Sequence, residues 1–202
     1  YCLEYSFGYN EFLENIVTIR NNKNLNNCNF TNKSNKFINS YYGIINTDKV
    51  IKNSYSLKNN AIISGPNACG KTTLLKSTLY NLILSQQIGK GYYEKGYINP
   101  YDYFHCYINI PDTCERDSLF QAEVRRCKEI LDHLEKYPDS RHFCIFDELY
   151  SGTNPYEAIS SAYSYLRCIA KNKNVKFLLT THYLKLCDLL QSNKKITNKS
   201  ME

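Results

Sequence analysis

The sequence lacks any long apolar run, since no stretch approaches the ~20 residues that a helix needs to cross a bilayer. It also lacks the charged start and apolar segment of a secretory signal peptide. We therefore expect no membrane span. Because the chain begins with Tyr1 rather than methionine, we interpret it as part of a longer protein.

Ordered cysteine spacing is also missing. The nine cysteines include no C-x-x-C pair and none spaced with a histidine as in a zinc finger. An odd number of scattered thiols favours a reducing compartment over a disulfide framework or a structural zinc site. We therefore expect an intracellular protein, in the cytoplasm or the nucleus.

The charge pattern carries no nucleic-acid signature. The formal net charge is only +6, and the lysines form no basic run. Aromatic and basic residues do not alternate as they do in single-strand binders. Direct DNA binding therefore does not follow from these residues themselves.

Short apolar runs alternate with helical patterns from about residue 41 onward. The runs predict buried strands at 61–64, 103–110, 143–146 and 177–181. A helical pattern follows each run, which predicts an α/β fold around a largely parallel sheet.

The first 44 residues break this alternation. Residues 1–20 predict a short amphipathic helix, and the asparagine-rich residues 21–40 predict a loop or insertion because they show no sustained period. We therefore divide the chain into residues 1–44, a remnant of a preceding domain, and a domain at 45–202.

Residues 65–72, GPNACGKT, match the phosphate-binding pattern G-x-x-x-x-G-K-[ST] between a predicted strand and a predicted helix. Lys71 is expected to reach the β- and γ-phosphates of ATP, and the Thr72 hydroxyl to ligate Mg²⁺. A chance match in a glycine turn is the alternative, against which the strand and helix argue. The expected nucleotide-binding residues are Gly65, Pro66, Asn67, Ala68, Cys69, Gly70, Lys71, Thr72 and Thr73.

Three polar residues follow predicted strands and are further candidates. Asp147 is expected to hold Mg²⁺ with Thr72 and to belong to the nucleotide site, and Glu148 to activate the attacking water. The alternative for this pair is a helix cap. His182 could orient the water or sense the γ-phosphate, although a lone histidine is more often structural.

The segment 114–131 predicts a helix whose buried side has the spacing Phe120, Val124, Cys127, Leu131 and Leu134. Ser118 and Gln121 fit a capping box at its start. A capped helix start can also bind phosphate through its free N–H groups. Spacing alone does not decide between the two.

Four motifs in order resemble the ATPase domain of the MutS family, the DNA mismatch-repair ATPases. They are G-P-N-x-x-G-K-[ST]-T at 65–73, Q-I-G at 87–89, D-E-x-x-x-G-T-x-x-x-[DE] at 147–157 and T-H-Y at 181–183. The resemblance covers about residues 45–202, and the segment ELYSGTNPYEA at 148–158 is similar to divergent MutS-like proteins. It implies a P-loop NTPase fold of the ATP-binding-cassette type, with a largely parallel sheet flanked by helices.

The resemblance also implies a role for residues 118–124, SLFQAEV, which are similar to the family's S-T-F-M-x-E-M. In MutS proteins this element crosses a dimer interface to the partner's γ-phosphate. Ser118 thus joins Lys71, Glu148 and His182 as a candidate catalytic residue. The implied assembly is a homodimer or paralogue heterodimer with composite ATP sites, and DNA contact is implied through domains missing from this chain.

The expected function is Mg²⁺-dependent ATP hydrolysis coupled to mismatched or branched DNA, in mismatch repair or recombination control. One alternative is a cassette ATPase of a non-repair protein, but the sequence lacks a Leu-Ser-Gly-Gly-Gln-like signature before 143–146. The other is a nucleotide-dependent scaffold without mismatch recognition, against which the intact Glu148 argues.

Overall fold

The computed structural model describes residues 2–44, 50–108, 110 and 119–201. The chain divides into two compact units, Tyr1–Ser56 with Lys76–Pro100, and Leu57–Leu75 with Tyr101–Glu202. The helix α2 (Lys71–Ile88) contains one of the boundaries. In the described residues, no helix has the length and apolar character needed to cross a membrane.

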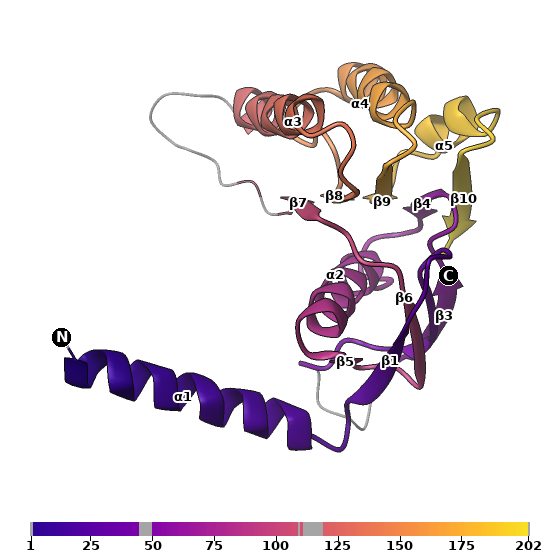
Figure 1. Cartoon of the computed structure of the whole chain (residues 1–202). Helices are drawn as coiled ribbons and strands as arrows, with labels where there is room; N and C mark the ends of the chain where they lie inside the picture. Colours follow the sequence, from indigo (N-terminus) through magenta and orange to yellow (C-terminus); the bar gives the residue numbers. More distant parts are fainter. Residues whose placement is uncertain (1, 45–49, 109, 111–118, 202) are drawn as a thin grey trace. The chain divides into compact units, whose positions relative to one another are not determined.

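The second unit is built on a five-stranded parallel sheet in the order β10-β4-β9-β8-β7. Three helices lie over one face of this sheet (Figure 1). The strands are β4 (Asn60–Ser64), β7 (Tyr103–Tyr107), β8 (His142–Asp147), β9 (Val175–Thr181) and β10 (Ile196–Ser200), and the helices are α3 (Leu119–Lys136), α4 (Pro155–Ile169) and α5 (Leu184–Leu190).

The central strands of this sheet are apolar because the sheet is buried on both faces. Every residue of β4 is buried, as are all residues of β8 before Asp147. A strand covered on both sides has no polar face, so its sequence reads as a continuous apolar run. The strands expected at 61–64, 103–110, 143–146 and 177–181 are confirmed as β4, β7, β8 and β9.

Helix α3 buries the side that the sequence predicts except at Val124, because Cys127 and Leu134 are buried and Phe120 and Leu131 pack against the core. Val124 is 41% exposed, whereas Glu123 and Ile130 are buried together with Cys127 and Leu134. The prediction for Val124 was wrong because Glu123 turns inward, where its carboxylate accepts hydrogen bonds from a neighbouring turn. A buried carboxylate is tolerated when its oxygens have such partners.

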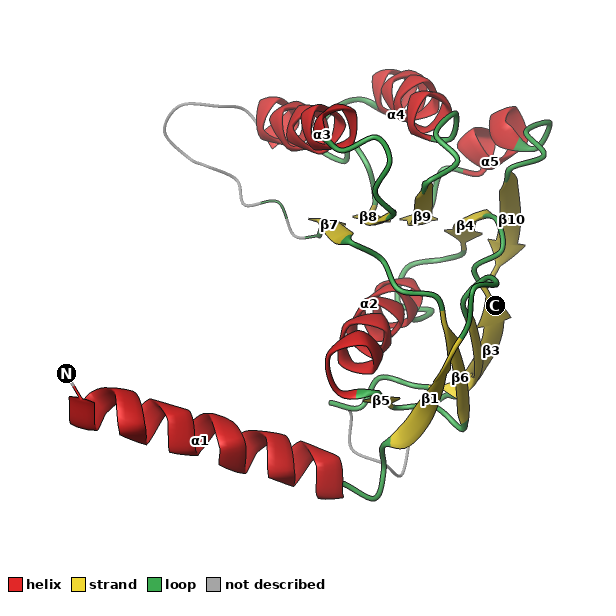
Figure 2. Cartoon of the chain, viewed as in Figure 1, coloured by secondary structure: helices red, strands yellow, loops and turns green. Residues whose placement is uncertain are grey.

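The first unit contains a mixed five-stranded sheet in the order β3-β2-β6-β1-β5. Only the pair β1 and β6 is parallel, and the other pairs are antiparallel. Figure 2 shows the strands and helices of the chain. The strands are β1 (Asn26–Phe30), β2 (Lys36–Ser40), β3 (Asn53–Ser56), β5 (Lys90–Gly91) and β6 (Lys95–Ile98), and the unit also holds α1 (Cys2–Asn21) and most of α2.

The loop predicted at 21–40 was wrong, because this stretch forms β1 and β2. Most of β1 is solvent-exposed, so it lacks the apolar alternation by which a strand is recognised. Asparagine side chains in this stretch form hydrogen bonds with the backbone of distant residues. Asn35 bonds the backbone N–H and C=O of Asn99, and Asn26 donates to the Tyr93 carbonyl. These bonds do not appear in a hydrophobicity pattern.

The helix predicted at residues 1–20 is present as α1, which has 20 residues. The apolar side chains that the structure describes in α1 do not form a buried face. The exposed fractions of Tyr9, Phe12 and Val17 are 54%, 58% and 55%. The predicted amphipathic character was wrong, because the apolar residues are scattered along the helix rather than gathered on one side.

Candidate functional site

A pocket with a volume of about 530 Å³ opens in the second unit, where β4 and β8 end. This volume is within the range of small-molecule sites. In open parallel sheets, ligands bind outside the carboxyl ends of the strands, which is where this pocket lies. It is lined by Asn67, Ala68, Gly70, Lys71, Thr72, Thr73, Tyr107, Ile110, Leu119, Glu123, Asp147, Glu148 and Ser151.

The loop at 65–72 joins β4 to α2 in a tight turn. Gly70 has a φ of +93° and Ala68 a φ of +65°, a region that is uncommon for a residue with a Cβ. Helix α2 begins at Lys71, so its first N–H groups lie at the pocket, together with the positive end of the helix dipole. The loop therefore presents an anion-binding surface to the pocket.

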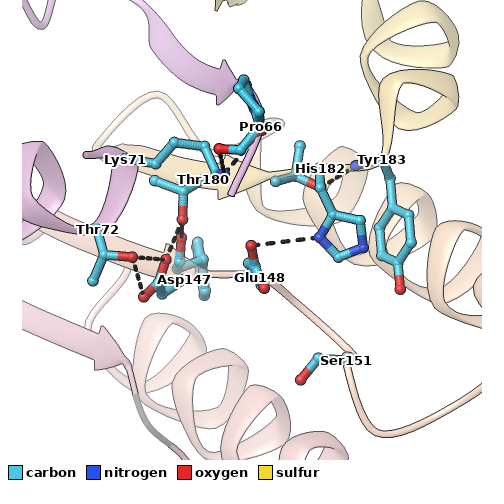
Figure 3. A network of polar contacts seen from close by, with 12 residues as sticks. Pro66, Lys71, Thr72, Asp147, Glu148, Ser151, Thr180, His182 and Tyr183 are labelled. Carbon is cyan, nitrogen blue, oxygen red and sulfur yellow. Dashed lines mark hydrogen bonds and ion pairs between the residues drawn. The ribbon is translucent and has the colours of Figure 1, made fainter. Parts of the chain in front are cut away.

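The Lys71 side chain is buried beneath this loop. Its Nζ donates hydrogen bonds to the carbonyl oxygens of Gly65, at 2.9 Å, and Pro66, at 2.8 Å. These two loop residues do not line the pocket, and they hold the ammonium group instead (Figure 3). A buried ammonium needs such acceptors, because its desolvation is otherwise costly.

The hydroxyl of Thr72 and the carboxylate of Asp147 meet at the pocket. Thr72 Oγ1 donates to both carboxylate oxygens of Asp147, at 3.1 and 2.9 Å, and Thr180 Oγ1 also donates to this carboxylate (Figure 3). Asp147 ends β8 and Thr180 lies on the adjacent β9. The fold thus brings together two oxygen donors, predicted from separate motifs, of the hard type that Mg²⁺ prefers.

Glu148 lies next to His182. The distance between Glu148 Oε1 and His182 Nδ1 is 3.4 Å, and both side chains are partly exposed. Glu148 has a φ of +53°, and its N–H donates to the Thr180 carbonyl at 3.0 Å. The turned backbone separates the Glu148 carboxylate from that of Asp147, so adjacent residues face different partners.

Glu123 is a residue whose place in the site the sequence reasoning missed. Its buried carboxylate accepts hydrogen bonds from the N–H of Ser151 at 2.9 Å, the hydroxyl of Ser151 at 3.1 Å and the N–H of Gly152 at 3.1 Å. Gly152 lies so close to α3 that a Cβ there would be 2.7 Å from Leu119 Cγ. The signal in the sequence was weak: Glu123 lies at helical spacing from Cys127 and Ile130, which are apolar and buried.

The turn after Glu148 is held from a second side by Tyr107. Its hydroxyl accepts a hydrogen bond from the N–H of Tyr150, which has a φ of +59°. Burial, together with the hydrogen bond to Glu123, raises the pKa of Tyr107. The hydroxyl therefore keeps its proton and can donate to Glu123 while it accepts from Tyr150.

The structure brings most of the candidate residues together. Cys69 lies in the loop but does not line the pocket, and His182 reaches the site only through Glu148. Ser118 lies outside the described residues, which resume with α3 at Leu119. The candidate residues that line the pocket are Asn67, Ala68, Gly70, Lys71, Thr72, Thr73, Asp147 and Glu148.

Comparisons with known proteins match residues 61–202 to MutS domain V. The chain is 31% identical over 158 residues to a DNA mismatch repair protein MutS of Bacteroides fragilis, covering 75% of this chain and 18% of that protein. It is 33% identical over 142 residues to the MutS of Clostridioides difficile, covering 69% of this chain and 14% of that protein. It is 29% identical over 170 residues to an Endonuclease MutS2 of Staphylococcus haemolyticus, covering 81% of this chain and 21% of that protein.

The chain thus spans about a fifth or less of the length of these relatives. The domain match covers most of its residues and includes every residue that lines the pocket. The sheet with mostly parallel pairs and flanking helices agrees with the expected α/β architecture. The chain therefore belongs to the MutS family, within which it corresponds to domain V.

Proposed function

We propose that this chain is the ATPase part of a longer MutS-like protein, and that it binds ATP with Mg²⁺ and hydrolyses it. The observation that carries the proposal is the contact between Thr72 and Asp147, which are 75 positions apart in the sequence. Lys71 and Glu148 line the same pocket. Together they supply an ammonium group, an oxygen pair for a cation and a carboxylate near a histidine.

The loop and the start of α2 suit the triphosphate of ATP. Free backbone N–H groups at a helix start bind phosphate oxygens, and the positive end of the helix dipole favours their charge. Lys71 is already placed at the loop by the carbonyls of Gly65 and Pro66. In our proposal its ammonium group turns from these acceptors to the β- and γ-phosphates.

Thr72 and Asp147 fit a magnesium ion. Their hydroxyl and carboxylate oxygens are hard donors, and the ion would coordinate them directly or through water. Bound there with ATP, Mg²⁺ would neutralise part of the phosphate charge. Thr180 holds the Asp147 carboxylate in place, because its hydroxyl donates to the same side chain.

Glu148 is the proposed general base. As the water oxygen forms a bond to the γ-phosphorus, its proton passes to the Glu148 carboxylate, and the bond to the oxygen bridging the β- and γ-phosphates breaks. The products are ADP and phosphate. His182, 3.4 Å from Glu148 Oε1, orients this carboxylate.

A second copy of the chain completes the site in this proposal. The resemblance of residues 118–124 to the family's interface element makes Ser118 the group that reaches the partner's γ-phosphate. The assembly is then a homodimer or a heterodimer with a paralogue. Each ATP site belongs to two chains.

We further propose that ATP turnover serves a DNA transaction of the longer protein, by way of domains outside this chain. Support comes from the relatives, which are a DNA mismatch repair protein and an endonuclease of the MutS2 type. Both mismatch repair and recombination control fit these names. The match to MutS domain V favours this function over a cassette ATPase of a transporter.

The substitution Glu148→Gln tests the base. We expect the rate of phosphate release to fall by roughly 10²- to 10⁴-fold, because the amide cannot accept the proton, whereas ATP affinity stays near that of the parent. Glu129→Gln, a change of the same kind at an exposed position of α3, is the control. A Glu148→Gln chain that hydrolyses ATP at the parental rate contradicts this assignment. If it and the parent both bind ATP without turnover, the scaffold function is supported instead.

A further inference from the structure

Three of the four histidines in the sequence gather in the second unit, away from the ATP-site residues. His105 lies on β7, His133 on α3 and His142 on β8, and one ring nitrogen of each lies within 4.8 Å of the other two. His105 and His142 are buried, and His133 is half-buried. His142 begins β8, whereas Asp147 ends it, so the cluster and the pocket residues lie toward different ends of this strand.

The parallel register explains how two of these rings meet. Tyr103 is paired with His142, and His105 with Cys144. Side chains two positions apart on a strand share a face, so His105 and His142 are diagonal neighbours on one face of the sheet. Helix α3 contacts β7 and carries His133 to the same place.

Hydrogen bonds identify the ring nitrogen of His142 that carries no proton. Its Nε2 lies 2.8 Å from the carbonyl oxygen of Tyr137, which can only accept, so Nε2 carries the proton. Its Nδ1 then holds a lone pair and lies 3.0 Å from His105 Nε2. A backbone carbonyl that fixes the far nitrogen of a histidine is the usual outer partner of a metal-binding imidazole.

His133 offers a second ring nitrogen. Its Nδ1 is buried, and among the residues that the structure describes it has no hydrogen-bond partner. The centroid of the His133 ring lies 4.6 Å from that of Tyr103 and 4.8 Å from that of Tyr137. A buried polar atom without a partner is costly, and it calls for a ligand or another explanation.

Two positive side chains, Arg126 and Lys136, lie near the three histidines. The guanidinium of Arg126 donates to the carbonyl of Cys106 and pairs with Glu129 at 2.9 Å, so its charge is partly offset.

We propose that His105, His133 and His142 bind a divalent transition-metal ion of the zinc class through three imidazole nitrogens, with water as a fourth ligand. Imidazole favours such ions over Mg²⁺, whereas the oxygen donors at Asp147 have the opposite preference. On binding, the ion replaces the hydrogen bond between His105 and His142. The proton on His105 Nε2 moves to Nδ1, so each ring keeps one proton.

The proposed ion has a structural role. It ties β7, α3 and β8 together through one residue from each. Helix α3 also carries Glu123, which holds the turn after Glu148. An ion bound by His133, near the end of α3, would therefore restrain the helix that supports the turn at Ser151 through Glu123.

Titration of the 202-residue chain with Co²⁺, a spectroscopic substitute for zinc, tests the site. The Asp147→Asn background removes the oxygen site, and one equivalent of Co²⁺ should still bind with the visible absorption of four- or five-coordinate cobalt. His133→Ala should weaken this binding by at least about 100-fold, since loss of a mere outer partner already costs 10- to 100-fold. His182→Ala, which removes the fourth histidine, is the matched control and should bind as the background does.

His133 suits this test because its ring is half-buried and its Nδ1 makes no hydrogen bond within the described residues, so its loss should leave the fold intact. Circular dichroism checks that point, and His105→Gln provides a second variant. Zn²⁺ should displace Co²⁺ and raise the Tm of the background chain but not of His133→Ala. No Co²⁺ binding by the background chain overturns the proposal. So does binding that survives His133→Ala unweakened, because groups other than this histidine cluster, such as the unchanged cysteines, then hold the ion.

Discussion

Asp147 and Glu148 are adjacent in the sequence, but their carboxylates contact different partners. Asp147 is held by the hydroxyls of Thr72 and Thr180, whereas Glu148 faces His182. The positive φ of Glu148 makes this possible, although such a conformation costs about 1–3 kcal/mol in a residue with a Cβ. Surrounding hydrogen bonds must offset that cost, and those that Glu123 accepts from the following turn are suited to do so.

We therefore predict that Glu123→Gln lowers kcat for ATP hydrolysis by roughly 10-fold or more while KM changes little. The reason is that a displaced turn at Ser151 would move Glu148, the proposed base, away from the attacking water. The amide group of glutamine donates where the turn also donates, so at least one N–H loses its acceptor. Steady-state kinetics separate the two constants. Glu129→Gln is the control on the same helix, and equal falls in kcat for both variants would argue against a positioning role for Glu123.

Among the helices and strands, α3 and β1 show where hydrophobic periodicity does not suffice to predict the structure. In α3 the spacing predicts the buried side but not the inward turn of Glu123, which depends on the hydrogen bonds from the turn at Ser151. In β1, five mostly exposed residues form a strand because β5 and β6 supply hydrogen-bond partners on either side. Such partners are distant in sequence, so a local pattern does not reveal them.

Asn35 tests this account of the first unit. Its buried side chain bonds both backbone groups of Asn99, so Asn35→Ala leaves an N–H and a C=O of Asn99 without this partner. We expect the free energy of unfolding to fall by about 1–3 kcal/mol. Asn27→Ala, at an exposed position of β1, should change it by less than about 0.5 kcal/mol. Urea unfolding of the two variants measures the difference, and equal shifts would refute the role of Asn35.

For the whole molecule, the chief question is whether one chain holds a complete ATP site. The chain belongs to the MutS family and spans less than a fifth of the length of the MutS proteins that it matches. The contacts of Lys71, Thr72, Asp147 and Glu148 lie within one chain. The proposed contribution of Ser118 comes from a second chain.

Mixing two inactive chains tests this composite site. Ser118→Ala and Lys71→Ala should each lower ATP turnover strongly, and Ser118→Ala should leave ATP binding by the single chain nearly unchanged. An equal mixture should recover roughly a quarter of the parental rate, because half of the dimers are mixed and each has one complete site. A mixture no more active than its components would show that Ser118 acts within its own chain or not at all. Phosphate release at a fixed total concentration is the measurement.

The buried strands, the loop at 65–72 and the position of the carboxylates at 147 and 148 could be predicted from the sequence, because these signals are local: apolar runs, glycine spacing and residues at strand ends. The division at residues 44 and 45 stays a prediction. Three features follow from the fold alone: Glu123 turns inward, the asparagine-rich residues pair as strands, and His105, His133 and His142 meet. Each of these depends on contacts between residues far apart in the chain, where strand register and helix rotation, rather than local spacing, choose the neighbours.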